Sequence, residues 1–325
     1  MPAEAVHLSA LHDTLPALPA AWRRLTTTGP AHEAARIGAI FVDLAYFESF
    51  ASAVVNYLLK RPQRPSPWGE RFHHRTPIRL GLALAEAGAA FRRQPSRRDE
   101  GELLLALGLG YFSHAAVDRA LHPLVNTLAR ERAQRLGRTL SEQHHEVEKF
   151  QSILFHEQRF GSDFMGRPLL GEYIGIDLSV LYRPGPIAQA VQNALAETHG
   201  QAPGLERYRN WCRGYGHYVR LIASPLGRTI APERDKRRER PRLFDAVNFG
   251  DRFAAAVSAS QRTVTTLCDY LDGGAFDEAA RAAFHRLIPE GTLDPDPGRP
   301  DGQPDVPGGT EGAQVMVMPP STTSV

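Results

Sequence analysis

Three residues that can bind a metal ion recur at every fourth position in the segment GYFSHAAVDRALHP. They are His114, Asp118 and His122. In a helix, a step of four residues rotates the side chain by only about 40°, so all three project from one side. That side also carries Leu107 and Leu121, which predicts that it is buried. Because a buried carboxylate must be paired or bound to a cation, we expect a positive group beside Asp118.

The spacing of the two histidines favours more than one metal ion. At a rise of 1.5 Å per residue, His114 and His122 lie roughly 12 Å apart along the helix axis, whereas zinc holds its ligands at about 2.0–2.2 Å. A single ion would struggle to bind both histidines. The geometry therefore predicts a pair of metals, with Asp118 between them and able to contact either metal or bridge the two.

A second expected helix carries a matching pair in the segment SEQHHEVEKF. His144 and Glu148 are four residues apart, so they can close on one metal, whereas His145 points about 100° away. A single His-x-x-x-Glu pair is common on solvated helix faces. Two helices that each carry metal-binding side chains at every fourth position, which we call ladders, favour a metal centre. Cys212 and Cys268 cannot form a thiolate site on their own. Histidine and carboxylate ligands favour zinc, with manganese or iron as alternatives.

Further positions can complete the coordination shells. Asp43 is the only charged residue in the apolar stretch 37–47, where its charge is costly unless it is neutralised. One of His73 and His74 is also an expected ligand, because both lie between the proline-rich excursion 60–69 and a helix, where a loop can lean a side chain over a site. At the N-terminus, His7 and His12 can act as ligands, cap a helix or lie in solvent.

Helices are the elements that must carry these side chains. Most segments have apolar residues at a spacing of three to four, and alternating β-branched runs are almost absent. The sequence therefore predicts an all-α, single multi-helix bundle with no internal repeat. The expected helices cover approximately 31–59, 77–93, 99–122, 124–136, 140–159, 186–199, 204–222, 243–271 and 276–286.

The composition excludes disorder along the whole chain. Its 325 residues are 42% hydrophobic and 23% charged, with 38 basic and 36 acidic side chains, as in a globular protein that buries a core. The longest apolar run, 103–112, falls short of the roughly 18 residues that span a bilayer, so we expect no transmembrane segment. The N-terminal residues lack the basic start and apolar block of a secretory signal, which predicts a cytoplasmic protein. The net charge of +2 gives no strong field, and we expect the basic run 234–242 to be a solvated loop.

The C-terminal segment has a different composition. From residue 289 it reads PEGTLDPDPGRPDGQPDVPGGTEG, which combines proline, glycine and acid with little apolar content, as is typical of disordered segments. We therefore expect one ordered domain over residues 1–288 and a disordered tail over residues 289–325.

The order of the candidate ligands resembles that of the zinc-dependent phospholipase C family. The series is an N-terminal histidine, an aspartate in an apolar helix, a histidine after a loop, the His-x-x-x-Asp-x-x-x-His block and then His-x-x-x-Glu. The block is similar to that of the related glycosylphosphatidylinositol-specific phospholipase D. The resemblance covers about residues 5–160, and nothing specific is recognised beyond it.

The resemblance implies a distribution of ligands among zinc ions. The first zinc would be held by Asp43, His73, His114 and Asp118, and the second by His122, His144 and Glu148. His7, with Asp118 bridging, would contribute to a third. His73 is preferred to His74 because Pro77, four residues after His73, resembles the loop pattern of the family.

Two departures from the family limit what the resemblance implies. In secreted members the third zinc is completed by the amino group of a processed N-terminal tryptophan, and the Met1-Pro2 start offers no equivalent. We therefore expect two zinc ions and leave the third open. Leu44 follows Asp43 where an aromatic residue could help to cage choline, so a preference for phosphatidylcholine is not implied.

The implied activity is hydrolysis of a phosphate ester, with a phospholipid as the first substrate class. Two zinc ions a few ångströms apart would share a bridging water, lower its pKa towards about 7 and present it as hydroxide to phosphorus. Asp43 would be the catalytic residue that accepts the proton of this water. The expected class is a phospholipase C-type phosphodiesterase.

The sequence is compatible with three other functions. A three-zinc single-strand nuclease would bind nucleic acid by stacking bases on aromatic side chains beside the metals; the candidates are Phe41, Tyr46, Phe47, Trp68 and Phe72, although such residues are more often core. A non-catalytic helical protein with a structural metal cluster would have closed coordination shells. The dipeptide His12-Asp13 is similar to that of helical HD-type phosphohydrolases, but it lies too near the terminus for the upstream histidine that those enzymes need.

Overall fold

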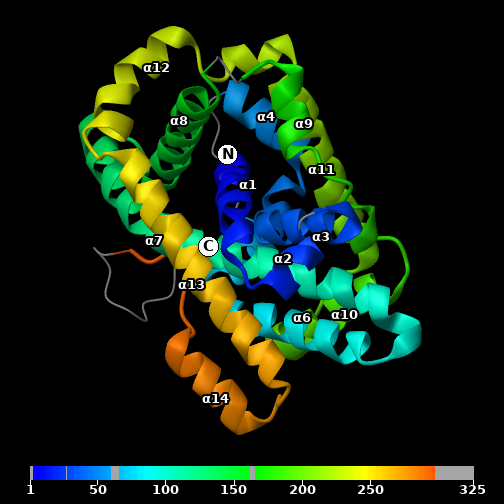
Figure 1. Ribbon diagram of the computed structural model, residues 1–325. Helices are drawn as coiled ribbons and strands as arrows, with labels where there is room; N and C mark the ends of the chain where they lie inside the picture. Colours follow the sequence, from blue (N-terminus) through cyan, green and yellow to red (C-terminus); the bar gives the residue numbers. More distant parts are fainter. Residues whose placement is uncertain (1–2, 27, 60–65, 162–164, 297–325) are drawn as a thin grey trace, which may run out of the picture.

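Helices form every regular element in the part of the chain that the computed structural model describes, which comprises residues 3–26, 28–59, 66–161 and 165–296. The expected all-α bundle is therefore confirmed (Figure 1). None of the helices in these ranges combines the length and the hydropathy needed to cross a bilayer. The α-helices are α1 (Ala3–Thr14), α2 (Ala20–Thr26), α3 (Gly29–Ile40), α4 (Phe50–Leu58), α5 (Pro67–His74), α6 (Pro77–Arg92), α7 (Arg98–Leu136), α8 (Leu140–Phe160), α9 (Pro168–Ile174), α10 (Pro186–His199), α11 (Leu205–Ala223), α12 (Glu233–Arg240), α13 (Phe249–Gly273) and α14 (Glu278–Leu287).

The longest helix, α7, is the element around which the others pack. It has 39 residues and contacts α3, α6, α8 and α13 along its length. Two glycines permit the closest of these contacts. A Cβ atom at Gly110 would lie 1.9 Å from the carbonyl oxygen of Ala35, and one at Gly38 would lie 2.0 Å from that of Leu107. Because no side chain fits at either position, α3 lies directly against the part of α7 that carries the first ladder.

Helix α7 continues through Pro123, where we expected one helix to end at residue 122 and another to begin at 124. A proline inside a helix costs roughly 3 kcal/mol. Buried side chains on both sides of it, among them Leu121 and Val125, keep the two halves in the core and offset that cost. The helical register is therefore unbroken, and the ladder of every fourth residue extends to Asn126.

The expected helix 31–59 is divided into α3, a 3-10 turn at Asp43–Phe47 and α4. All residues from 37 to 45 are buried except Asp43, which is only partly exposed. A continuous helix through this stretch would have no polar face. The chain instead turns at Asp43, and the turn fixes the direction in which the Asp43 carboxylate points.

The proline-rich excursion 60–69 ends in a helix rather than in a loop. Residues 60–65 of the excursion lie outside the described residues, but α5 begins at Pro67. Its N-terminus is capped by the Ser66 hydroxyl, which accepts a hydrogen bond from the Gly69 amide at 3.2 Å. His73 is therefore carried by the last turn of a short helix, which holds it more rigidly than the expected loop would.

The basic run at 234–242 is also not a loop. Most of it forms α12, which packs on α8. Lys236 and Glu239 are buried and paired with Glu157 and Arg132, respectively. The run is thus an amphipathic helix whose inward face is made of ion pairs, a pattern that apolar periodicity does not detect.

Residues 289–296, which we expected to belong to the disordered tail, pack against the helices. We call residues 288–296 the C-terminal strap, because this segment lies across the end of α5, the start of α6 and the middle and C-terminal half of α7. Leu293 is fully buried, and its amide donates to the carbonyl oxygen of His73 at 2.8 Å. The Arg119 side chain donates to three strap carbonyls, those of Pro289, Gly291 and Thr292. The remainder of the expected tail, residues 297–325, lies outside the described residues.

A buried acid on α1 predicts how stability depends on pH. Glu4 is only 3% exposed and accepts a hydrogen bond from the Tyr218 hydroxyl. Burial raises the pKa of Glu4 from 4.5 to about 8. Since this pKa is raised on folding, the contribution of Glu4 to stability is complete below pH 4.5 and is lost as the pH rises through 8.

We expect Glu4→Gln to remove this loss, so that the metal-free variant gains about 4 kcal/mol over wild type between pH 5 and pH 9. Urea unfolding at the two pH values measures the difference. Glu206→Gln, at a carboxyl that is 64% exposed, is the control and should show no such gain. Equal pH dependence in wild type and Glu4→Gln would contradict the assignment.

Candidate metal centre

The predicted ligands meet at one place in the fold, although they come from distant parts of the chain. Helix α1 supplies His7, the 3-10 turn supplies Asp43, and α5 supplies His73. The remaining side chains are His114, Asp118 and His122 from α7 and His144 and Glu148 from α8. Figure 1 shows α1 beside α7 and α8, and these helices are in contact.

Asp118 lies at the middle of this cluster and is 2% exposed. Its Oδ2 atom is 2.9 Å from His114 Nε2 and 3.6 Å from His73 Nε2. Its Oδ1 atom is 3.3 Å from His7 Nε2 and 3.5 Å from His122 Nε2. The two oxygens thus face different sets of histidines, which is the bridging position that the helical spacing predicted for this carboxylate.

Within the described residues, three sets of side chains have ligand atoms close enough to enclose an ion. In each set the atoms lie within 4.8 Å of one another. The sets are His7 with His114 and Asp118, Asp43 with His73 and His114, and His122 with His144 and Glu148. The third set is the one that the resemblance implied for a second zinc. The first two divide the remaining implied ligands and share His114.

The histidine rings are held by hydrogen bonds on the side away from the cluster. His73 Nδ1 is 2.9 Å from the Gly69 carbonyl oxygen, and His114 Nδ1 is 2.9 Å from that of Ala39. Carbonyl oxygens only accept, so these rings carry a proton on Nδ1 and present an Nε2 lone pair to the cluster. Outer acceptors of this kind fix the tautomer and orientation of metal-binding histidines.

The charge of the cluster has no compensation from lysine or arginine among the described residues. The basic side chains within 4.0 Å of Asp43, Asp118 and Glu148 are all histidines. Burial would lower the pKa of His114, but the Asp118 carboxylate beside it raises that pKa to about 9. Without a metal, protons on histidines must balance the carboxylates.

Two buried atoms are placed so that one cation could contact both. His114 Nε2 and Asp118 Oδ2 are 2.9 Å apart, yet neither has a hydrogen-bond partner of acceptable geometry among the described residues. A buried polar atom without a partner costs about 1–3 kcal/mol. A cation that accepts the lone pairs of both atoms would satisfy them together, and the imidazole and carboxylate donor set suits zinc.

The other candidates lie outside the three sets. His12 is exposed, and Asp13 pairs with Arg159 at 2.7 Å, so this dipeptide is not part of the cluster. His74 contacts Glu70 and Thr292, which leaves His73 as the member of the pair that faces Asp43. His145 is 49% exposed and reaches only the outer oxygen of Glu148.

The aromatic candidates for base stacking are mostly core residues. Phe41, Phe47, Trp68 and Phe72 are each 6% exposed or less and belong to the hydrophobic core. Only Tyr46 is partly exposed, and its hydroxyl is 3.4 Å from His73 Nδ1. A stacking surface beside the cluster is therefore reduced to one ring.

Two polar residues of the site were not predicted. Asn126 Oδ1 is 2.9 Å from His144 Nδ1, and Asp294 Oδ1 is 3.1 Å from His122 Nδ1. Asn126 is the next step of the every-fourth-residue ladder, so its position could have been found from the spacing. Asp294 had no such signal, because it lies in a segment whose composition is typical of disorder.

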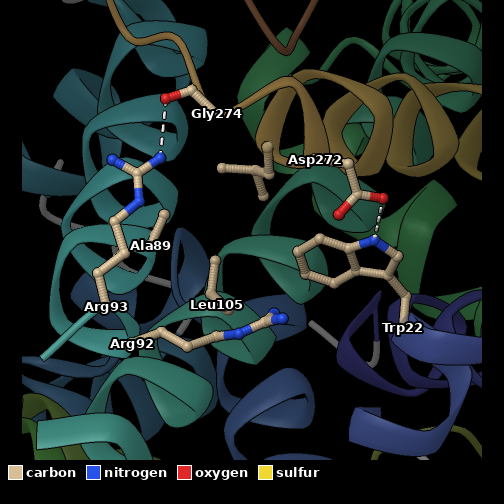
Figure 2. Close-up of a pocket in the computed structure, with 8 residues that line it drawn as sticks. Trp22, Ala89, Arg92, Arg93, Leu105, Asp272 and Gly274 are labelled. Atoms are coloured by element: carbon tan, nitrogen blue, oxygen red, sulfur yellow. Dashed lines mark hydrogen bonds between the residues drawn. The ribbon is translucent and has the colours of Figure 1, made fainter. Parts of the chain in front are cut away.

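A separate cavity of about 280 Å³ lies at the junction of α2, α6, α7 and α13, and none of its lining residues is a predicted ligand. Figure 2 shows Trp22 donating a hydrogen bond to Asp272 and Arg93 donating one to the carbonyl of Gly274. These polar groups bond to one another across the cavity. The candidate metal centre is thus a cluster of converging side chains distinct from this cavity.

Comparisons of the chain with family models, with curated proteins and with solved structures found no match.

Asp118 is the residue whose removal tests the candidate metal centre. We expect Asp118→Ala to lose most of the bound zinc and any activity together, because both oxygens of Asp118 face candidate ligand sets. Metal analysis of the purified proteins measures the stoichiometry. Asp13→Asn, which removes an acid from the surface ion pair with Arg159, is the matched control and should keep the wild-type zinc content. Full zinc stoichiometry in Asp118→Ala would refute this description of the site.

Proposed function

We propose that this protein is a zinc-dependent hydrolase of phosphate esters, with phospholipase C-type cleavage of a phosphodiester as its activity. The observation that carries the proposal is the position of Asp118, whose two carboxylate oxygens face two sets of histidines. Paired metals a few ångströms apart suit phosphoryl chemistry, since they neutralise oxygen charges on the phosphate and lower the pKa of a bound water. The order of the ligands, which resembles that of the zinc-dependent phospholipase C family, also supports it.

The edge of the cluster is partly open, which favours catalysis over a purely structural role. The side chains of Asp43, His144 and Glu148 are 15–16% exposed, whereas those of His114 and Asp118 are 3% exposed or less. Structural zinc sites are closed by protein ligands, whereas catalytic sites keep a position for water or substrate. A substrate would approach from the side of the partly exposed ligands. The buried ligands would bind the metals on the opposite side, away from solvent.

Asp43 is the residue of this chain that we assign to proton transfer. Its Oδ1 atom is 3.4 Å from His73 Nε2, and its Oδ2 atom is 4.0 Å from His7 Nε2. It therefore belongs to one ligand set and lies at the open edge, where an incoming water would come within its reach. His7 and His73 would hold the carboxylate in this orientation.

We expect Asp43→Asn to lower kcat by a factor of about 10²–10⁴, the usual contribution of a general base. Zinc content must be measured in the same samples and restored to the wild-type level, because Asp43 is also a candidate ligand. Glu48→Gln, which removes a nearby acid paired with Arg207, should leave the rate unchanged.

The substrate panel separates the proposal from its alternatives. Zinc-loaded wild-type protein is assayed on a short-chain phospholipid, a phosphomonoester and single-stranded DNA. Turnover of the phospholipid supports the proposal, and turnover of DNA alone would establish the nuclease instead. Firmly bound zinc with no turnover of any substrate would indicate a structural metal cluster.

A further inference from the structure

The C-terminal strap connects the elements that carry the candidate ligands. Glu290 accepts hydrogen bonds from the amides of Ile78 and Arg79 at 2.9 and 3.0 Å. It thereby caps the N-terminus of α6, where Thr76 makes no side-chain cap. Leu293 bonds to the backbone of His73. The strap is thus fixed to the last turn of α5, which carries His73, and to the first turn of α6.

One strap residue reaches the outer side of the set His122, His144 and Glu148. Asp294 Oδ1 lies 3.1 Å from His122 Nδ1 and accepts a hydrogen bond from Asn126 Nδ2 at 2.6 Å. The Oδ1 atom of Asn126 in turn accepts from His144 Nδ1 at 2.9 Å. Asp294 thus lies beside His122 Nδ1, which has no hydrogen-bond partner of acceptable geometry among the described residues, and it reaches His144 through the hydrogen bonds of Asn126.

The Nε2 atoms of the same two rings point toward the third member of the set, Glu148. His122 Nε2 and His144 Nε2 each lie 3.4 Å from Glu148 Oε1. A carboxylate on Nδ1 keeps the proton on that nitrogen and makes Nε2 more basic, which strengthens a bond from Nε2 to a metal. Asn126 must present its oxygen to His144, because its NH₂ group donates to Asp294. The tautomers of both rings are consistent with Nε2 as the metal-binding atom.

We propose that Asp294 is a positioning residue that sets the metal affinity of the site formed by His122, His144 and Glu148. This inference rests on the proposed function only in so far as the cluster binds zinc. It makes the strap part of the metal centre: docking of residues 288–296 and occupancy of this site stabilise each other, since a coupling between two sites is reciprocal.

The test compares zinc affinities of full-length variants by competition with a chromophoric chelator. We expect Asp294→Asn to weaken one zinc about 10-fold and Asp294→Ala about 100-fold, the range found when outer partners of zinc ligands are removed. The affinity of the other zinc should change less than about threefold. Asp296→Asn, which changes the same charge two residues along the strap at a pair with Arg130, is the matched control and should bind both ions as wild type does.

A spectroscopic readout distinguishes positioning from simple loss of folding. In the zinc-loaded wild type, ¹⁵N NMR of the histidine rings should show the Nδ1 proton of His122, and Asp294→Ala should change the signals of His122 and His144 while those of His73 and His114 stay. Equal weakening of both zinc ions together with loss of the metal-free fold would refute the inference, as would unchanged affinity in both Asp294 variants.

The outcomes for the two proposals are separable. If wild-type protein binds zinc and the Asp294 variants behave as expected, but no phosphate ester is hydrolysed, the proposed function fails and the role of Asp294 stands. If wild type hydrolyses a phosphate ester and the variants bind zinc normally, only the role of Asp294 fails. If wild type binds no zinc, both are wrong.

Discussion

The constraint on which the structure depends is the burial of carboxylates whose basic neighbours, among the described residues, are all histidines. Asp118 is almost fully buried in the middle of α7, and the described residues place no lysine or arginine within 4.0 Å of it. Such a charge is tolerated only if protons or metal ions balance it. The helices α1, α5 and α8 meet α7 at this point and bring the histidines that provide either solution. The fold is therefore organised around a charge that it cannot leave unpaired.

Close backbone packing is what lets the outer hydrogen bonds form. Because glycine at positions 38 and 110 allows α3 to touch α7, the Ala39 carbonyl reaches His114 Nδ1 at 2.9 Å. The turn of the chain after α3 then places Asp43 beside the same ring set. A larger residue at either glycine would separate the helices and lose both the acceptor and the position of Asp43. The orientation of the ligands is thus set by the packing of two helices.

The sequence was most informative where the chemistry follows the helical repeat. Every fourth residue of α7 and α8 shares a face, so the convergence of His114, Asp118 and His122 could be predicted without knowing the fold. The turn at Asp43 and the helix that carries His73 depend on tertiary burial, and their boundaries were predicted wrongly. The C-terminal strap was missed for another reason. Its composition is typical of a disordered segment. Its acidic side chains nevertheless bind fixed partners, the N-terminus of α6 and Asn126, which lie far away in the sequence and so leave no trace in a local pattern.

The sharing of one ring limits how many ions the three candidate ligand sets could hold together. His114 belongs to two of the three ligand sets, but its Nδ1 is bonded to Ala39 and only the Nε2 lone pair faces the cluster. One lone pair binds one ion, so the sets with His7 and with Asp43 and His73 cannot both use His114. Asp118 can still bridge, because its two oxygens face different sides. Among the described residues, the donors therefore support two ions more readily than three, one on each side of Asp118. A third would need donors from His7 and from groups other than His114.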